Sequence, residues 1–417
     1  MGASSPLKTI AQVIGLQSAL DAQTPRNTVI LFGDSLSAQS GTGPSVLAVA
    51  PISDPSAFVP GVGYWIWANA YLGQRASLVR NAGVGGDTVA MMRARIQTDV
   101  MPYPSGWVVF MGGANDVVQG RSLAAIQSDI TFILDTLSAA GRRVLIMTAP
   151  PSANYDTAPE RAVLAGLNKW IHGLPLARLG VYVVDAWRVL ADPATGYPAT
   201  GMATDSVHFT SSGAQRVGRA MFNVLDPLMP RNPSRVLGLT DPDNICGNPH
   251  FGSGTGWSTL GSDVSVAYAT ADDRWSSKAT LTITGVENST ERGIQYVEPV
   301  AAGRYAAGDI VQATVRLRWS NATPVTSATG LFQPFLRIWP RKADGSWGVA
   351  ILGMIVASSS ARQPVGNQIA SGDIVAATFR MALPANVANL YIGVGWQGMS
   401  SGTIEVSDLA VYKNAGV

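Results

Sequence analysis

The chain has little of the chemistry on which disulfide-rich, metal-binding and nucleic-acid-binding proteins depend. Its 417 residues contain one cysteine, Cys246, which excludes an intramolecular disulfide and a cysteine cluster holding zinc or iron–sulfur. Only 13% of the residues are charged, about half the usual share, and the net charge is +2. Because nucleic-acid-binding surfaces need clustered Lys and Arg, we expect no nucleic-acid partner.

Long apolar runs and a secretory leader are also missing. The longest apolar run, Val349 to Ala357, is far shorter than the ~18 residues that a membrane helix needs. Near the start of the chain, Gln12, Gln17 and Ser18 interrupt the apolar residues that a signal peptide would keep together. We therefore expect a soluble protein with no signal peptide and no membrane partner.

What the chain does have is enough apolar residues, 47% of the total, to form two or three domains. Residues 26–230 alternate β-rich runs with helical patterns. Strands are expected at Thr28–Phe32, Ser77–Arg80, Trp107–Met111, Arg143–Thr148 and Val181–Asp185, and helices at Val62–Leu72, Thr88–Thr98, Ser122–Ala140, Pro159–Ile171 and Ser211–Leu225. Near-continuous apolar strands separated by helices predict a parallel sheet with right-handed crossovers. This region is predicted to be a three-layer α/β domain.

The composition changes after Pro227. Prolines recur in the stretch from Pro227 to Asp243, and residues 231–245 are predicted to be a linker. From 246 to 417 the chain carries short alternating segments separated by Gly, Ser, Asn and Pro, which predict an antiparallel β-sandwich. Its strands are expected at Val264–Ala269, Ala279–Thr284, Ile310–Trp319, Phe335–Trp339, Ile374–Met381, Leu390–Gly395 and Thr403–Tyr412. Residues 1–25 are expected to form a third, small unit.

Polar and glycine-rich segments follow the first three strands of the α/β region. They are Gly33–Ser37, which contains Ser35, then Asn81–Thr88 and Gly112–Asp116. A fourth segment, Asp205–His208, precedes the last helix. Because the carboxyl ends of parallel strands meet at one edge of a sheet, the loops after the strands should lie together there.

These segments contain the residue types that nucleophilic catalysis needs. A serine hydroxyl is a poor nucleophile until a base takes its proton, and histidine suits that task near neutral pH. Of the three histidines, only His208 has an acidic residue at a useful spacing, because Asp205 lies three positions before it. His172 is expected near a helix end, and His250 lies in the other domain. Ser35, His208 and Asp205 are therefore the candidate nucleophile, base and orienting carboxylate.

Other site chemistries are less well supported. Asp34, Asp87 and Asp116 could form the paired carboxylates of a glycosidase, but each flanks Gly or Asn in a loop where Asp commonly holds a turn. The glycines of Gly83–Gly86 do not follow either nucleotide-binding pattern. No two histidines have the spacing of metal ligands, so we expect neither a metal nor a cofactor.

The four segments, in this order, resemble the sequence blocks of the SGNH, or GDSL-type, hydrolase superfamily of esterases and lipases. The resemblance covers residues 26–230 and implies a flavodoxin-like α/β fold. It also implies an oxyanion hole made by the backbone N–H groups of Ser35 and Gly86 and by the Asn115 side-chain amide.

The flanking regions carry shorter resemblances. The segment from Cys246 to Trp257 resembles the opening of jelly-roll carbohydrate-binding modules, and Ile404–Tyr412 resembles their last strand. Aromatic rings can stack on sugars, but most tryptophans in a sandwich fill its core, so a structural or oligomerising sandwich remains open. The stub at Lys8–Asp21 resembles a segment of phage tail fibres, which implies a homotrimer.

Together these features predict a serine esterase that removes O-acetyl groups from a bacterial surface polysaccharide as part of a phage tail fibre or spike. Its expected partner is an acetylated polysaccharide or a small ester, and its expected place is the virion, acting at the bacterial cell surface. Two alternatives stay open, since a fold does not choose among functions. One is a glycan-binding adhesin with little catalysis, and the other is a general lipase or thioesterase.

Overall fold

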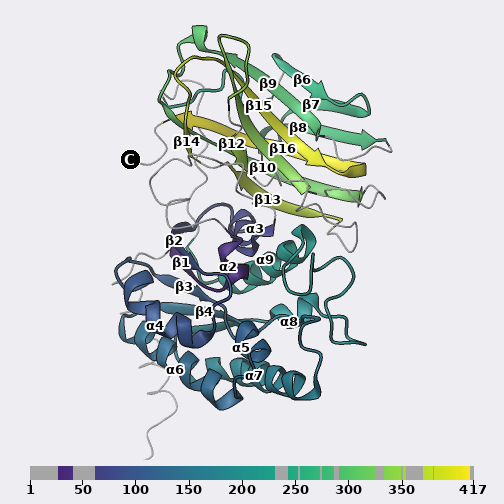
Figure 1. Ribbon diagram of the computed structural model, residues 1–417. Coiled ribbons are helices and arrows are strands. Elements are labelled where there is room, and N and C mark those ends of the chain that lie inside the picture. Colours follow the sequence, from purple (N-terminus) through teal and green to yellow (C-terminus); the bar gives the residue numbers. More distant parts are fainter. Residues whose placement is uncertain are drawn as a thin grey trace, which may run out of the picture.

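The computed structural model describes residues 27–40, 62–230, 243–251, 254–272, 275–285, 291–324, 333–348, 351–353, 370–378 and 380–413. The stub predicted at 1–25 and residues 231–242 of the predicted linker lie outside these ranges. Figure 1 shows a helix-covered sheet below and two antiparallel sheets above it. None of the helices in the described ranges combines the length and the apolar character needed to cross a membrane.

The lower unit contains a sheet of five parallel strands in the order β2-β1-β3-β4-β5. Its strands are β1 (Thr28–Gly33), β2 (Ser77–Gly83), β3 (Trp107–Phe110), β4 (Arg143–Met147) and β5 (Val181–Val184). The predicted parallel sheet is confirmed. Because the chain passes from β1 outward to β2 and then back to β3, the sheet has its topological switch point at β1, where open α/β folds place their sites.

Helices cover both faces of this sheet (Figure 1). Alternate residues of β1 enter two separate apolar clusters, with Val29 and Leu31 on one face and Ile30 and Phe32 on the other. The first face is covered by α3 (Tyr64–Tyr71), α8 (Ala186–Leu190) and α9 (Ser211–Leu225), and the second by α4 (Val89–Asp99), α6 (Leu123–Ala139) and α7 (Ala158–Ala177). Two short helices, α2 (Ser35–Ala38) and α5 (Ala114–Val118), lie at the sheet edge. The domain therefore has the three layers that the sequence predicted.

Hydroxyl side chains fix where the longer helices begin. The side chains of Thr88, Ser122, Thr157 and Thr210 accept hydrogen bonds from the backbone N–H three residues ahead, at the starts of α4, α6, α7 and α9. Such a cap typically stabilises a helix by ~1 kcal/mol. Thr210 lies two residues after His208, so the start of α9 also anchors that loop.

The upper unit consists of two antiparallel sheets, which confirms the predicted β-sandwich fold class. One sheet has the order β13-β10-β16-β8-β7, with β14 also paired to β10, and the other has the order β12-β11-β15-β9-β6. The elements are β6 (Trp257–Leu260), β7 (Val264–Asp272), β8 (Trp275–Thr284), β9 (Glu291–Pro299), the 3-10 helix η3 (Val300–Ala302), β10 (Ile310–Pro324), β11 (Gln333–Lys342), β12 (Ile351–Gly353), β13 (Gly372–Ala377), β14 (Met381–Ala382), β15 (Val387–Gln397) and β16 (Met399–Lys413).

The strand expected at Ile374–Met381 is two strands in the structure. β13 pairs with residues 314–319 of β10, whereas β14 pairs with residues 310–311. Between them, the Thr378 side chain accepts a hydrogen bond from the Ala313 N–H at 2.9 Å, while its own N–H donates to the Ala313 carbonyl. A side chain thus takes the place of a backbone partner in the ladder, and the strand breaks there.

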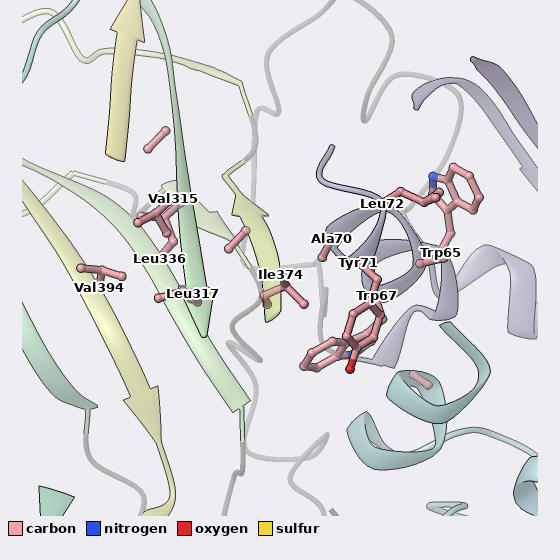
Figure 2. Close-up of a cluster of buried hydrophobic side chains, with 14 of the residues drawn as sticks. Trp65, Trp67, Ala70, Tyr71, Leu72, Val315, Leu317, Leu336, Ile374 and Val394 are labelled. Atoms are coloured by element: carbon pink, nitrogen blue, oxygen red, sulfur yellow. The ribbon is translucent and has the colours of Figure 1, made fainter. Parts of the chain in front are cut away.

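The two units share one continuous apolar cluster at their junction. Figure 2 shows Ile374 on β13 lying between the sandwich residues Val315 and Leu317 and the α3 residues Ala70 and Tyr71. A hydrogen bond of 2.7 Å from Gln74 Nε2 to the Val375 carbonyl also crosses this junction. The sandwich is therefore packed against the α3 face of the α/β domain.

Candidate active site

Ser35 is held at the carboxyl end of β1 by its neighbours. A Cβ at Gly33 would lie 2.3 Å from Ser37 Oγ and 2.6 Å from the Met111 carbonyl oxygen, so only glycine fits this position. The buried Asp34 caps α2, because its carboxylate accepts the Leu36 N–H at 3.0 Å. Ser35 is the first residue of that helix and is half-buried. Its hydroxyl therefore stands at the switch point of the sheet.

His208 is fixed by a tight loop that its own neighbour closes. One oxygen of Asp205 accepts the N–H groups of Val207 and His208, both at 2.7 Å. The Thr204 N–H donates to the His208 carbonyl at 2.8 Å, and Thr210 then starts α9. The three-residue spacing of Asp205 and His208 is thus a consequence of one small turn.

The structure brings the three predicted residues into one hydrogen-bonded series. Ser35 Oγ lies 3.0 Å from His208 Nε2, and His208 Nδ1 lies 2.8 Å from Asp205 Oδ2. Because a carboxylate only accepts hydrogen bonds, the Nδ1–H donates to Asp205, and Nε2 of the neutral ring is left to accept the serine proton. This is the geometry that a serine nucleophile, a general base and an orienting carboxylate require.

The surroundings of Asp205 favour its ionised form. Partial burial raises the pKa of this carboxyl, but hydrogen bonds from the His208 N–H, the His208 ring and the Val207 N–H outweigh that effect and lower the pKa below its ordinary value. A charged Asp205 can fix the imidazole tautomer and stabilise the imidazolium that forms during catalysis.

The predicted oxyanion-hole residues lie beside the nucleophile. A Cβ at Gly85 would lie 3.8 Å from the Cβ of Ser35, and Gly86 has a left-handed φ of 82° with open space where a side chain would stand. Among the residues that the structure describes, none accepts a hydrogen bond from the Ser35 or Gly86 N–H. The Asn115 amide donates one hydrogen bond to the Asp87 carbonyl at 2.9 Å, which holds this side chain next to the Gly86 turn.

One arginine, which the sequence did not single out, ties these loops together. The guanidinium of Arg95, on α4, donates to the Gly33 carbonyl at 2.9 Å, to the Ala82 carbonyl at 2.8 Å and to the Asp87 carboxylate at 2.6 Å. Gly33 is two residues before Ser35, and Asp87 follows Gly86. A single planar side chain thus fixes the spacing between both backbone donors of the oxyanion hole.

The three carboxylates considered for a glycosidase have structural partners. Asp87 pairs with Arg95, and the buried Asp116 accepts the Val89 N–H at 2.9 Å and pairs with Arg121. Asp34 caps α2, and its burial raises its pKa to about 7. These partners account for all three side chains without a role in acid–base catalysis.

The remaining histidines lie away from Ser35. His172 is on α7, where its Nε2 is 3.2 Å from Asp185 Oδ2, and the His250 carbonyl accepts a hydrogen bond from the Ser277 hydroxyl. Within the described residues, no three His, Cys, Asp or Glu side chains are grouped so that they could hold a metal ion.

A pocket of about 310 Å³ lies between the loops that follow β4 and β5. Its walls include Tyr155, Trp187 and Tyr197. At its edge, the Ser152 hydroxyl and the Ala153 N–H both donate to the Ser206 carbonyl, in the loop that carries His208. No sequence motif indicated this pocket.

The sequence pattern of the GDSL-like Lipase/Acylhydrolase family matches residues 31–216. Residues 31–216 are a GDSL-like lipase/acylhydrolase domain. The match confirms the resemblance drawn from the four sequence blocks. It starts within β1 and ends within α9, so the GDSL domain contains Ser35, Gly86, Asn115, Asp205 and His208.

Solved structures align with about half of this chain over nearly their own whole length. A lipase/acylhydrolase from Enterococcus faecalis is 21% identical, covering 50% of this chain and 99% of its own, with a TM-score of 0.38. An acetyl-xylooligosaccharide esterase variant from Geobacillus stearmophilus is 18% identical, covering 48% and 94%, with a TM-score of 0.39. A GDSL-like lipase from Bacteroides thetaiotaomicron is 13% identical, covering 52% and 98%, with a TM-score of 0.38. No curated protein matches the chain.

Proposed function

We propose that the GDSL domain is a serine ester hydrolase, and that the chain removes O-acetyl groups from a bacterial surface polysaccharide as part of a phage tail fibre or spike. The observation that carries the hydrolase assignment is the hydrogen-bonded series from Ser35 Oγ through His208 to Asp205. It stands beside two backbone N–H groups, on Ser35 and Gly86, which can donate hydrogen bonds to the negative charge that develops on the carbonyl oxygen.

In the first half of the reaction, His208 Nε2 takes the proton of Ser35 as its Oγ attacks the ester carbonyl carbon. The carbonyl oxygen becomes an oxyanion, which the Ser35 and Gly86 N–H groups and the Asn115 amide stabilise. Asp205 stabilises the imidazolium through the 2.8 Å contact with Nδ1. His208 then gives its proton to the leaving sugar oxygen, the bond from carbon to that oxygen breaks, and an acetyl-serine remains.

In the second half, water takes the place of the sugar hydroxyl. His208 removes a proton from the water, the resulting hydroxide attacks the acetyl carbonyl carbon, and the same three donors hold the oxyanion. The bond to Ser35 Oγ then breaks, His208 returns the proton to the serine, and acetate leaves. No cofactor takes part in these steps.

The proposed substrate and setting rest on the parts of the chain outside the GDSL domain. The sandwich sequence resembles carbohydrate-binding modules at its two ends, and the stub resembles phage tail-fibre segments. The aromatic side chains of the sandwich give less support to sugar binding, because Trp319 and Trp396 are about 1% exposed or less and pack against each other in its core, with ring centres 4.9 Å apart. Among esters, an acetylated glycan agrees best with the resemblances of the sandwich and of the stub.

Acetate release from a panel of bacterial capsular and O-antigen polysaccharides tests the proposal. We expect release from at least one acetylated polysaccharide by the full chain, and none by Ser35→Ala, while both proteins give the same circular dichroism spectrum. Glycan binding that survives Ser35→Ala, with no acetate released from any member, would favour the adhesin instead. Faster hydrolysis of long-chain acyl esters than of any acetyl ester would favour a lipase or thioesterase.

A further inference from the structure

The pocket between the loops that follow β4 and β5 has no role in the proposed reaction steps. Its walls include several aromatic side chains. Its lining includes Tyr155, Arg161, Leu164, Trp187, Thr195 and Tyr197. Its volume of about 310 Å³ lies at the lower end of the range of small-molecule sites. A pocket of this size would take one compact group of a substrate.

The pocket adjoins the catalytic loop. Ser152, which lines it, donates its hydroxyl hydrogen to the Ser206 carbonyl, and Ser206 lies between Asp205 and His208. In the sheet order, β4 lies two strands from β1, so its loop is on the order of 10 Å from Ser35 at the usual strand spacing. A substrate bound at Ser35 can therefore extend into the pocket past His208.

The position of His208 determines which half of an ester extends toward the pocket. The leaving alcohol oxygen must face His208, because His208 protonates it, whereas the carbonyl oxygen must face Gly86 and Asn115. Gly86 follows β2, on the opposite side of β1 from β4 and β5. Asn115 follows β3, but its amide is held toward the Gly86 turn by the hydrogen bond to the Asp87 carbonyl. The pocket is thus on the side of the alcohol half of the ester.

The side chains of the pocket suit a sugar ring. Trp187 and Tyr197 supply flat apolar surfaces, on which the carbon–hydrogen face of a sugar can stack. Around them are hydrogen-bonding groups that can meet sugar hydroxyls, namely Thr195 and the exposed Arg161. The Arg161 guanidinium lies 5.0 Å from the centre of the Tyr197 ring and also donates hydrogen bonds to Asp156, the Tyr155 carbonyl and the Tyr197 hydroxyl. Tyr155, also in the wall, has a buried hydroxyl that bonds to no residue in the described part of the chain.

We propose that this pocket is a sugar subsite for the alcohol half of the ester, with Trp187 and Tyr197 as the residues that select acetylated glycans over simple acetyl esters. The proposal rests on the proposed function, because it assumes that Ser35 attacks an ester. It adds the chemical class of the alcohol and the residues that recognise it.

Three kinds of ester show which half of the substrate occupies the pocket. Neither half of ethyl acetate can fill it. The alcohol half of a mono-O-acetylated methyl glycoside can fill it, and so can the acyl half of ethyl octanoate. A panel of acetylated methyl glucoside, galactoside, mannoside, rhamnoside and xylobioside covers different sugars. We expect the wild-type kcat/KM for at least one glycoside to exceed that for ethyl acetate tenfold or more.

Trp187→Ala is the main variant. It should lower kcat/KM on the preferred glycoside about tenfold or more, and leave kcat/KM on ethyl acetate within about twofold of wild type. Thr195→Phe, at an exposed position, should have the same selective effect by filling the pocket, which keeps the test valid if Trp187→Ala folds poorly. Phe132→Ala is the matched control, because it removes an aromatic ring that is 39% exposed on α6; it should change neither rate.

The possible outcomes distinguish a failure of the pocket proposal from a failure of the proposed function. If Ser35→Ala is inactive on ethyl acetate but Trp187→Ala and Thr195→Phe hydrolyse every glycoside at the wild-type rate, the pocket proposal is wrong and the hydrolase stands. The pocket proposal would also be overturned if the wild-type enzyme did not prefer any glycoside to ethyl acetate. A selective loss of kcat/KM on ethyl octanoate in Trp187→Ala and Thr195→Phe would overturn it as well. Full activity of Ser35→Ala would instead overturn the proposed function.

Discussion

Among single residues, Asp34 makes the stability of the fold depend on pH. Its side chain is 1% exposed, and burial raises its pKa from an ordinary value near 4 to about 7. Between these two values the folded protein binds a proton that the unfolded chain has already lost. The contribution of Asp34 to the free energy of unfolding is therefore complete below about pH 4 and falls as the pH rises to about 7.

Asp34→Asn should remove this pH dependence. Asparagine can still cap α2, so we expect the free energy of unfolding of Asp34→Asn, relative to wild type, to increase by up to ~4 kcal/mol between pH 4 and pH 7.5. Urea unfolding of both proteins at several pH values measures the difference. Parallel stability curves for the two proteins would show that Asp34 does not titrate in this range.

Asn115 is the side-chain member of the oxyanion hole, and its loss should affect the rate and not substrate binding. Asn115→Ala is expected to lower kcat on a small acetyl ester about 10²- to 10³-fold, with little change in KM, because the amide acts on charge that develops only in the transition state. Steady-state kinetics on ethyl acetate measures both constants. A rise in KM at constant kcat would assign Asn115 to substrate binding.

The triad positions could be predicted from the sequence, but the pocket could not. Ser35 lies two residues after a buried strand, and Asp205 and His208 are close in sequence, so local patterns indicated each of them. Trp187 lies on the short helix α8, and Tyr197 lies ten residues later in the loop after that helix, where the sequence has no strong pattern. Only the fold brings them together with Tyr155, which follows a different strand.

Among the helices and strands, α4 supports the catalytic loops through the side chain of Arg95. Lysine at this position would keep the charge but could not reach Gly33, Ala82 and Asp87 at once. Arg95→Lys should therefore loosen the two oxyanion-hole turns and lower kcat on ethyl acetate about 10- to 100-fold. Arg93→Lys is the matched control on the same helix, because Arg93 pairs with Asp129 on α6, and it should keep wild-type kcat. Equal effects of the two substitutions would contradict the role given to Arg95.

Most elements of the α/β domain were predicted, whereas several in the sandwich were not. The expected helix Pro159–Ile171 continues to Ala177 in the structure, past Gly173 and Pro175, because the apolar Leu174 still packs into the core. The strand β9 was not predicted, because its buried residues are three in a row, Arg292–Ile294, and then Glu298, so they do not alternate with exposed ones. Pairing with β6 and β15 determines that strand, and pairing is not a local property.

At the scale of the whole molecule, the shared apolar cluster should make the two units unfold together. We expect one calorimetric transition for the wild-type chain. Ala70→Glu would place a charge at a fully buried position that faces β13 (Figure 2), at a cost of several kcal/mol, so it should give two separate transitions. Ala162→Glu, at an exposed position on α7, is the control and should keep one. Two transitions in the wild type would show that the units are independent.

The assignment of Ser35 as the nucleophile of an ester hydrolase can be tested in a single comparison. The rate of acetate release from ethyl acetate is measured for the purified wild-type chain and for Ser35→Ala, with circular dichroism to confirm that both are folded. We expect measurable release by the wild type and a loss of at least about 10³-fold in Ser35→Ala. Release by a folded Ser35→Ala at the wild-type rate would contradict the assignment.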